Sequence, residues 1–111
     1  MNTKICTGMT KKDLFNAQSA SRTISEAIDE GLVFEITGIA VIENGATSKN
    51  GQPCDVGYIA TKNNGVFGFT SNVIIGMLDM LSEMIGEEPI EGRFKAGNTK
   101  DGTQYYTIEL V

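Results

Sequence analysis

The segment 66–96, VFGFTSNVIIGMLDMLSEMIGEEPIEGRFKA, contains a short apolar run, an amphipathic stretch and an alternating stretch in direct succession. Apolar residues of the middle part recur every three or four positions, which predicts a helix capped by Ser71 or Asn72 and closed by Gly86. These apolar residues are Val73, Ile74, Met77, Leu78, Leu81, Met84 and Ile85. The run 66–69 and the alternation over 90–96 predict strands. A helix is therefore expected between two strands.

Two more strand candidates precede this segment, and one follows it. The longest spans 32–43, and Gly38 in its middle predicts a bulge or a sharp bend. A polar loop at 44–53 separates it from a strand at 56–61, which the turn 63–65 joins to the strand 66–69. The turn 98–102 leads into a last strand at 103–110. The order is thus three strands, a helix and two strands.

The residues before this sheet predict a helical segment at 10–30. Thr10 can cap its start, and Asp13 stands three residues on, close to a capping-box arrangement. The centre, 19–23, is rich in Ser and Thr, so a break into two short helices is compatible with the pattern. Gly31 is suited to end the segment.

Five strands with a helix between the third and the fourth is the order of the OB fold, a partly open Greek-key barrel. We therefore expect a mainly β, α+β chain: a five-stranded OB-type barrel over 32–111, preceded by the N-terminal helix. An open α+β sheet of the same order is the competing fold. The 111 residues suit one domain, 1–111.

Composition argues against several functional classes. The chain has no histidine, and no phosphate-binding loop or dinucleotide motif is present, so we expect no enzyme, no metal site and no cofactor. No apolar run is long enough to span a membrane, and the N-terminus has no signal-peptide core. Cys6 and Cys54 are interpreted as reduced thiols of a cytoplasmic protein. The net charge of −5 disfavours nucleic acid as a ligand but does not exclude it.

Basic and aromatic residues nevertheless gather where an OB barrel binds its ligands. The loops between the first two and the last two strands border that cleft. Single-stranded nucleic acid is bound by cations that follow its backbone and by rings on which bases stack. The candidates for this role are Lys49, Tyr58, Lys62, Phe67, Phe69, Arg93, Lys95, Lys100 and Tyr105.

Each candidate also has a structural interpretation. Phe67 and Phe69 are expected in the core more readily than on a stacking surface, because a short apolar strand buries its large side chains. Tyr58 and Tyr105 fit either role. Arg93 and Lys95 are also ordinary residues of a solvated sheet face. The apolar stripe that contains Met77 and Met84 is interpreted as core packing.

The chain from about residue 30 onwards resembles the small single-stranded DNA-binding proteins of tailed phages that replicate by strand displacement, the phi29-like group. The resemblance rests on VFEITGIAVIEN, NGQPCDVGYIAT, NNGVFGFTSNVI and the closing hairpin FKAGNTKDGTQYYTIEL. It implies an OB-like fold, cooperative and sequence-tolerant binding of single-stranded DNA, and no catalysis. Members of that family stack bases on Tyr and Phe residues of the barrel. The resemblance assigns this role first to Tyr58 and Tyr105 and, after them, to Phe67 and Phe69. The low count of cations, nine against fourteen acids, departs from the pattern.

The leading hypothesis is a single-stranded DNA-binding protein of phage or mobile-element replication, active in the bacterial host cytoplasm. Its partner would be single-stranded DNA, and a homo-oligomer formed through strand edges is compatible with the sequence. The alternative is a protein–protein interaction module, such as a phage assembly component or an inhibitor of a host factor. Its acidic surface would then be the interface, and the N-terminal helix is a further candidate for it.

Overall fold

The computed structural model describes residues 2–111, which form six strands and three helices. In chain order they are β1 (Asn2–Thr7), α1 (Lys11–Ala20), α2 (Ile24–Glu30), β2 (Phe34–Thr47), β3 (Pro53–Thr61), β4 (Val66–Phe69), α3 (Asn72–Met84), β5 (Ile90–Asn98) and β6 (Gln104–Leu110). The expected order from β2 to β6, with a helix after the third of these strands, is confirmed. The N-terminal helix is divided in two, and β1 is a strand that the sequence analysis did not anticipate.

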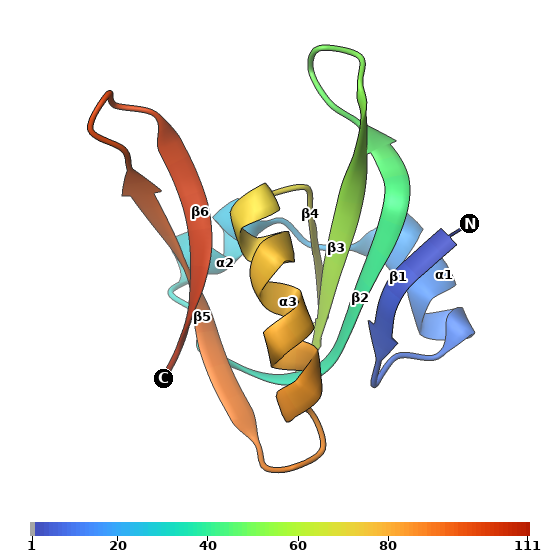
Figure 1. Cartoon of the computed structure of the whole chain (residues 1–111). Coiled ribbons are helices and arrows are strands. Elements are labelled where there is room, and N and C mark those ends of the chain that lie inside the picture. Colours follow the sequence, from blue (N-terminus) through green and yellow to red (C-terminus); the bar gives the residue numbers. More distant parts are fainter. Residues whose placement is uncertain (1) are drawn as a thin grey trace.

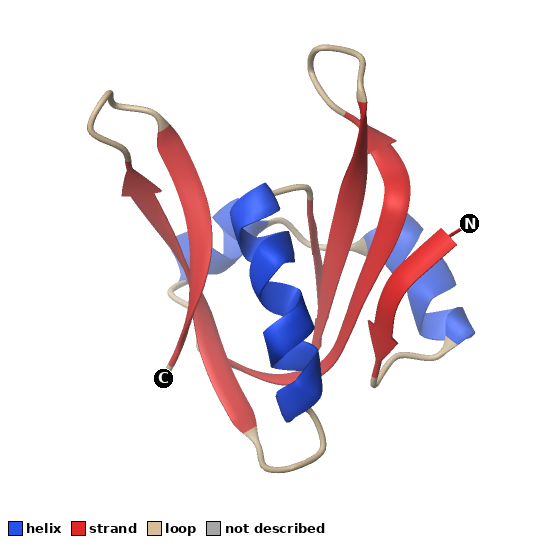
Figure 2. Cartoon of the chain, in the orientation of Figure 1, coloured by secondary structure: helices blue, strands red, loops and turns tan. Residues whose placement is uncertain are grey.

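One antiparallel sheet has the order β4-β3-β2-β5-β6, and β1 also pairs with β2. One edge of β2 pairs with β3, and the other is shared: β5 pairs with 34–36 and β1 with 39–43. The two long ribbons, β2–β3 and β5–β6, therefore separate from one another beyond residue 36. Figures 1 and 2 show them on either side of α3.

The second edge of β2 changes partner around Gly38, where the sequence predicts a bend. A Cβ on Gly38 would lie 2.6 Å from Cγ of Met9 and 2.7 Å from the carbonyl oxygen of Gly8. No side chain fits there, because the chain leaving β1 crosses β2 directly against this residue. The register of β2 with β3 also shifts between Ile36 and Gly38, which confirms the predicted irregularity.

The sheet is not closed into a barrel. In residues 2–111 no pairing joins β4 to β6, and Arg22, between α1 and α2, forms a parallel bridge with Phe67 instead. The N–H of Arg22 donates to the carbonyl of Val66 at 2.8 Å, and the N–H of Gly68 donates to the carbonyl of Arg22 at 3.0 Å. Because this segment takes the free edge of β4, β6 finds no partner there. The structure is thus mainly β, with an open antiparallel sheet and three helices.

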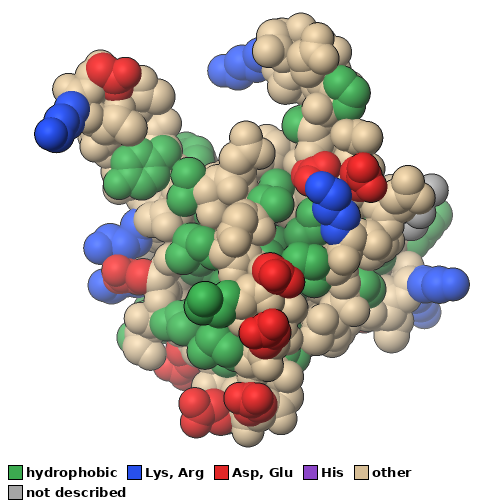
Figure 3. All heavy atoms as spheres, viewed as in Figure 1, with side chains coloured by type: hydrophobic (Ala, Val, Ile, Leu, Met, Phe, Trp, Pro, Cys, Tyr) green, Lys and Arg blue, Asp and Glu red, His purple; other side chains and the backbone are tan. Residues whose placement is uncertain are grey.

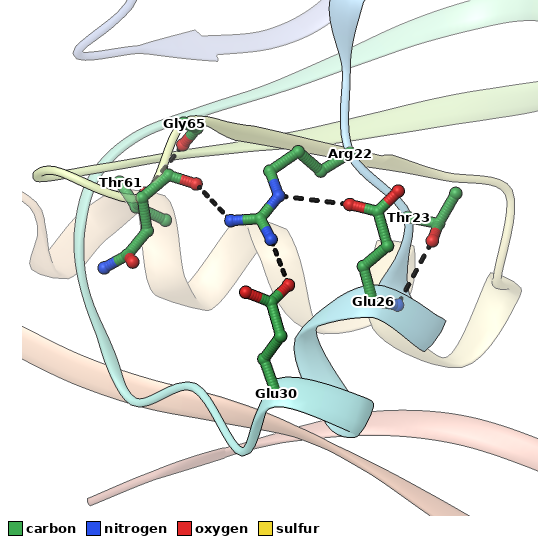
Figure 4. A network of polar contacts seen from close by, with 7 residues as sticks. Arg22, Thr23, Glu26, Glu30, Thr61 and Gly65 are labelled. Carbon is green, nitrogen blue, oxygen red and sulfur yellow. Dashed lines mark hydrogen bonds and ion pairs between the residues drawn. The ribbon is translucent and has the colours of Figure 1, made fainter.

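Side-chain contacts hold Arg22 in this position (Figure 4). Its guanidinium donates to Glu26 at 3.1 Å, to Glu30, and to the carbonyl of Asn64 at 3.1 Å. The same group lies 5.3 Å from the centre of the Phe67 ring, within cation–π range. Thr23 caps α2 through the N–H of Glu26. Arg22 thereby joins α2, the β3–β4 turn and the core.

The main core lies between the sheet and α3 and is centred on phenylalanines. Phe34 lies 5.4 Å from Phe67 and 5.2 Å from Phe94, ring centre to ring centre. The helix α3 buries one face against them, and that face consists of Ile74, Leu78 and Leu81.

A second, smaller core lies on the outer face of β2 and β3, under α1. Thr10 and Asp13 form the expected capping box at the start of α1. Leu14 and Ala17 are the buried residues of this helix. They belong to a cluster with Met9, Ala40, Ile42, Val56 and Tyr58. The N-terminal segment therefore covers a sheet face that would otherwise be open to ligands.

Candidate functional site

The β2–β3 and β5–β6 hairpins end in two copies of one turn. The sequences are Ser-Lys-Asn-Gly-Gln at 48–52 and Thr-Lys-Asp-Gly-Thr at 99–103. In each, the first N–H donates to the fifth carbonyl, at 2.8 Å and 2.9 Å, and the fourth N–H donates to the first carbonyl at 3.0 Å. In each, the third side chain accepts from the first hydroxyl and the fifth N–H. The glycines at the fourth position, Gly51 and Gly102, have φ of +83° and +86°.

The turn places a lysine at its second position, Lys49 in one hairpin and Lys100 in the other. Both side chains are exposed, and neither forms an ion pair within residues 2–111. The two hairpins project from the same side of the molecule, beyond the N-terminal end of α3 (Figure 1). Figure 3 shows two separate arms, each with a basic side chain near its end, and a hollow between them. The structure therefore brings both loop lysines to one opening.

Hydrogen bonds stiffen the β5–β6 turn around an acidic residue. Donation from the Thr99 hydroxyl and the Thr103 N–H holds the pKa of Asp101 below its ordinary value. An aspartate is ionised at neutral pH in any case, so Asp101 places a negative charge next to Lys100. The corresponding residue of the other turn, Asn50, is neutral, so the two arms differ by one charge.

Lys62 lies away from this opening. It follows β3 in a third turn, and β3 separates that turn from the β2–β3 hairpin end. Its N–H donates to the carbonyl of Glu35 at 3.0 Å. The sequence places Tyr58 and Lys62 on one face of a strand, but the structure does not bring Lys62 to the two arms.

Arg93, Lys95 and Tyr105 share the outer face of the β5–β6 ribbon, as the alternation predicts. Arg93 stands directly opposite Glu109 in the register. The hydrogen bond from Arg93 and then that from Lys95, at 3.2 Å, hold the pKa of Glu109 below its ordinary value. This carboxylate therefore cancels one of the two positive charges on the face.

Tyr105 remains available on that outer face. It is 38% exposed and lies opposite Gly97 in the register. A Cβ on Gly97 would come within 2.6 Å of Cζ of Tyr105, so the ring lies across the bare backbone of the neighbouring strand. Glycine there gives the ring a flat support on one side. Tyr105 is the second residue after the turn that holds Lys100.

Three of the predicted stacking residues are buried. Phe67 and Phe69 belong to the main core, which agrees with their structural interpretation, because β4 points both rings at Phe94. Tyr58 is only 6% exposed, and its burial raises its pKa. It lies beneath α1, which occupies the outer face of β3. The prediction that these three rings stack on bases is therefore wrong, because a buried ring has no face open to a base.

A hollow of about 280 Å³ lies where β4 leads into α3, facing β6. Tyr106 is part of its wall: its hydroxyl is 3.3 Å from that of Ser25, and its carbonyl accepts from the Ser71 hydroxyl at 3.4 Å. Thr23, Ile24, Gly68, Phe69 and Thr70 complete the lining. Of these residues, sequence analysis names only Phe69 as a binding candidate, and the signal of the others is a high content of Ser and Thr. The hollow occupies the place where closure of the sheet would have joined β4 to β6.

Other kinds of site find little support in residues 2–111. No group of three or more Cys, Asp and Glu residues there could hold a metal ion. None of the helices in the same range has the length and apolar character needed to cross a membrane. Comparisons with models of protein families, with curated proteins and with solved structures found no match for this chain. The geometry of the two arms is therefore the basis for any functional assignment.

Proposed function

We propose that this protein binds single-stranded DNA without sequence preference, in phage or mobile-element replication in the host cytoplasm. The observation that carries the proposal is the pair of turns with the same hydrogen-bond pattern, which present Lys49 and Lys100 on either side of one opening. The strand order, with α3 between β4 and β5, supports an OB-type topology. In that fold the loops between the first two and the last two strands border the ligand.

The proposed binding mode assigns separate tasks to the two kinds of residue. Lys49 and Lys100 contact phosphates, because exposed lysines without a carboxylate partner are free to replace the counterions of the DNA backbone. Tyr105 stacks on a base, supported from behind by Gly97. Arg93 and Lys95 add a field with a net charge of about +1 beside this ring, since Glu109 neutralises one of them.

Few cations take part, so affinity should depend mainly on stacking and fall only moderately as the salt concentration rises. Each phosphate contact contributes about 0.7 to the slope of log K against log salt for single strands. Stacking on one aromatic ring contributes about 1–3 kcal/mol per base. Removal of Tyr105 should therefore weaken binding more than removal of either lysine at moderate salt.

The test is fluorescence anisotropy of labelled oligo(dT) across a salt series, with thermal melting of each variant to verify its fold. Lys49→Gln and Lys100→Gln should each weaken binding and lower the salt slope by about 0.7. Tyr105→Ala should weaken binding with little change of slope, and Tyr105→Phe should restore it. Lys62→Gln is the matched control, because Lys62 also follows a hydroxyl residue in a hairpin turn but lies away from the opening.

If the protein does not bind oligo(dT) at low salt, the proposal is wrong. If Lys62→Gln weakens binding as much as Lys49→Gln does, the DNA binds elsewhere on the surface.

A further inference from the structure

The helix α3 carries a second apolar face that the fold leaves open. Ile74, Leu78 and Leu81 bury one side of the helix. Val73, Met77 and Met80 lie on another side and are exposed, and Met80 reaches 72%. A helix that covers a sheet needs a single apolar stripe, so this second stripe is not explained by the fold. The interpretation of the predicted stripe as core packing is wrong for Val73 and Met77, and Met80 was not part of that stripe.

This stripe forms one wall of a groove. The other wall is the end of β6, and the groove has a volume of about 300 Å³. Its lining is entirely apolar apart from one glycine: Gly76, Met77, Met80, Leu81, Met84, Ile108 and Leu110. Met77 also receives a weak hydrogen bond from the Thr107 hydroxyl at 3.6 Å, which holds the two walls together. Flexible, polarizable methionine side chains are typical of surfaces that accept apolar side chains of a partner.

The charge around the groove is one-sided. From residue 63 to residue 92 the chain contains five acidic residues and no lysine or arginine. Asp79, Glu83, Glu87 and Glu88 form no ion pair within residues 2–111. On the β6 side, by contrast, Glu109 is already neutralised by Arg93 and Lys95. Figure 3 shows hydrophobic side chains gathered over α3, with acidic side chains beside and below them.

We infer that this groove binds an amphipathic helix of a partner protein, one with bulky apolar residues on one side and lysine or arginine on its flank. Apolar side chains spaced by three and four residues would lie along Gly76, Met80 and Met84. The basic flank would face the unpaired carboxylates of α3 and the turn after it. A second copy of this chain would be repelled, because it would bring the same carboxylates to the interface. An anionic lipid surface or a DNA strand would be repelled for the same reason. The groove is thus distinct from the proposed DNA-binding opening.

The probe is a fluorescein-labelled peptide of about 18 residues, long enough to form a helix, with leucines at helical spacing and lysines elsewhere. The same peptide with glutamates in place of lysines controls for charge, and a scrambled leucine–lysine peptide controls for helical spacing. Anisotropy should show binding of the first peptide alone. Met80→Gln should weaken that binding at least about tenfold, the effect of losing one apolar anchor.

Two further variants separate this site from general attraction. Phe15→Gln is the matched control, because Phe15 is as exposed as Met80 at 73% but lies on α1. It should leave peptide affinity unchanged. Gly76→Leu should abolish binding while keeping the fold, because a Cβ on Gly76 meets no atom within 4 Å and the larger side chain would fill the groove.

Three outcomes would overturn the inference. The first is no binding of the leucine–lysine peptide. The second is that the Met80→Gln and Phe15→Gln variants bind the peptide equally well, or that the scrambled peptide binds as well as the leucine–lysine peptide. The third is a dimer in light scattering that Met80→Gln dissociates, since a second copy would then be the occupant.

Discussion

Replacing Gly76 with alanine should make the protein more stable, because glycine stands inside a helix there without a steric reason. Gly76 lies in the interior of α3 (Asn72–Met84), and a Cβ at this position would meet nothing within 4 Å. Alanine is favoured over glycine in a helix interior by about 1 kcal/mol. Unfolding entropy is about 2.1 cal/mol/K per residue, or about 0.23 kcal/mol/K for a chain of this length. The melting temperature should therefore rise by about 4 °C, as measured by circular dichroism or calorimetry.

Gly31→Ala is the matched control for this prediction. A Cβ on Gly31 also meets nothing within 4 Å, but its φ is +64°, in the left-handed region that ends α2. Alanine there costs about 1 kcal/mol, so Tm should fall by about 4 °C instead. The two variants add the same methyl group to open space, and only backbone conformation distinguishes them. A fall in Tm for Gly76→Ala, or the same change at both positions, would refute this reasoning.

Other consequences of the fold can be measured by unfolding. Phe67→Ala should lower the free energy of unfolding in urea by about 3–5 kcal/mol, whereas Phe15→Ala should change it by less than about 0.5; equal effects would contradict the core assignment. Arg22→Met should lower it by about 1 kcal/mol and speed amide exchange at the β4 edge; unchanged exchange would show that the guanidinium contacts do not hold that bridge. Lys4 holds the pKa of Asp55 below its ordinary 3.8, so this carboxylate stabilises the fold above that pH and loses its effect as pH falls below it. The urea midpoint of Asp55→Asn should therefore fall less in acid than that of the parent, and parallel curves would exclude the link.

The order of elements from β2 onward could be predicted because each element has a local signal. Glycines and Asn-Gly or Asp-Gly pairs mark the turns, and apolar spacing changes from two to three or four between strand and helix. β1 has no such signal. Its residues are mostly exposed, and Ile5 is its one large apolar side chain, so only pairing with β2 makes it a strand. That pairing joins residues far apart in the chain, which local patterns do not report.

The candidate site was predictable only in part, for the same reason. Alternation correctly places Tyr58 on the face of β3 opposite to Ile59, but the docking of α1 on that face decides that its ring is buried. Likewise the Ser/Thr-rich break near Arg22 is visible in the sequence, whereas its pairing with the β4 edge is not. The two lysine turns are local patterns, and only the topology of the sheet places them on the same side of the molecule.

The docking of the N-terminal segment has a consequence for the order of events during synthesis. Residues 2–31 leave the ribosome before residues 34–69, yet β1 pairs with β2, α1 packs against Tyr58, and Arg22 bridges to Phe67. The N-terminal segment can therefore adopt its final contacts only after β2, β3 and β4 have formed. Until then α1 and α2 have no sheet face to pack against. We therefore expect folding to be completed when residues 2–31 pack onto the sheet that forms after them.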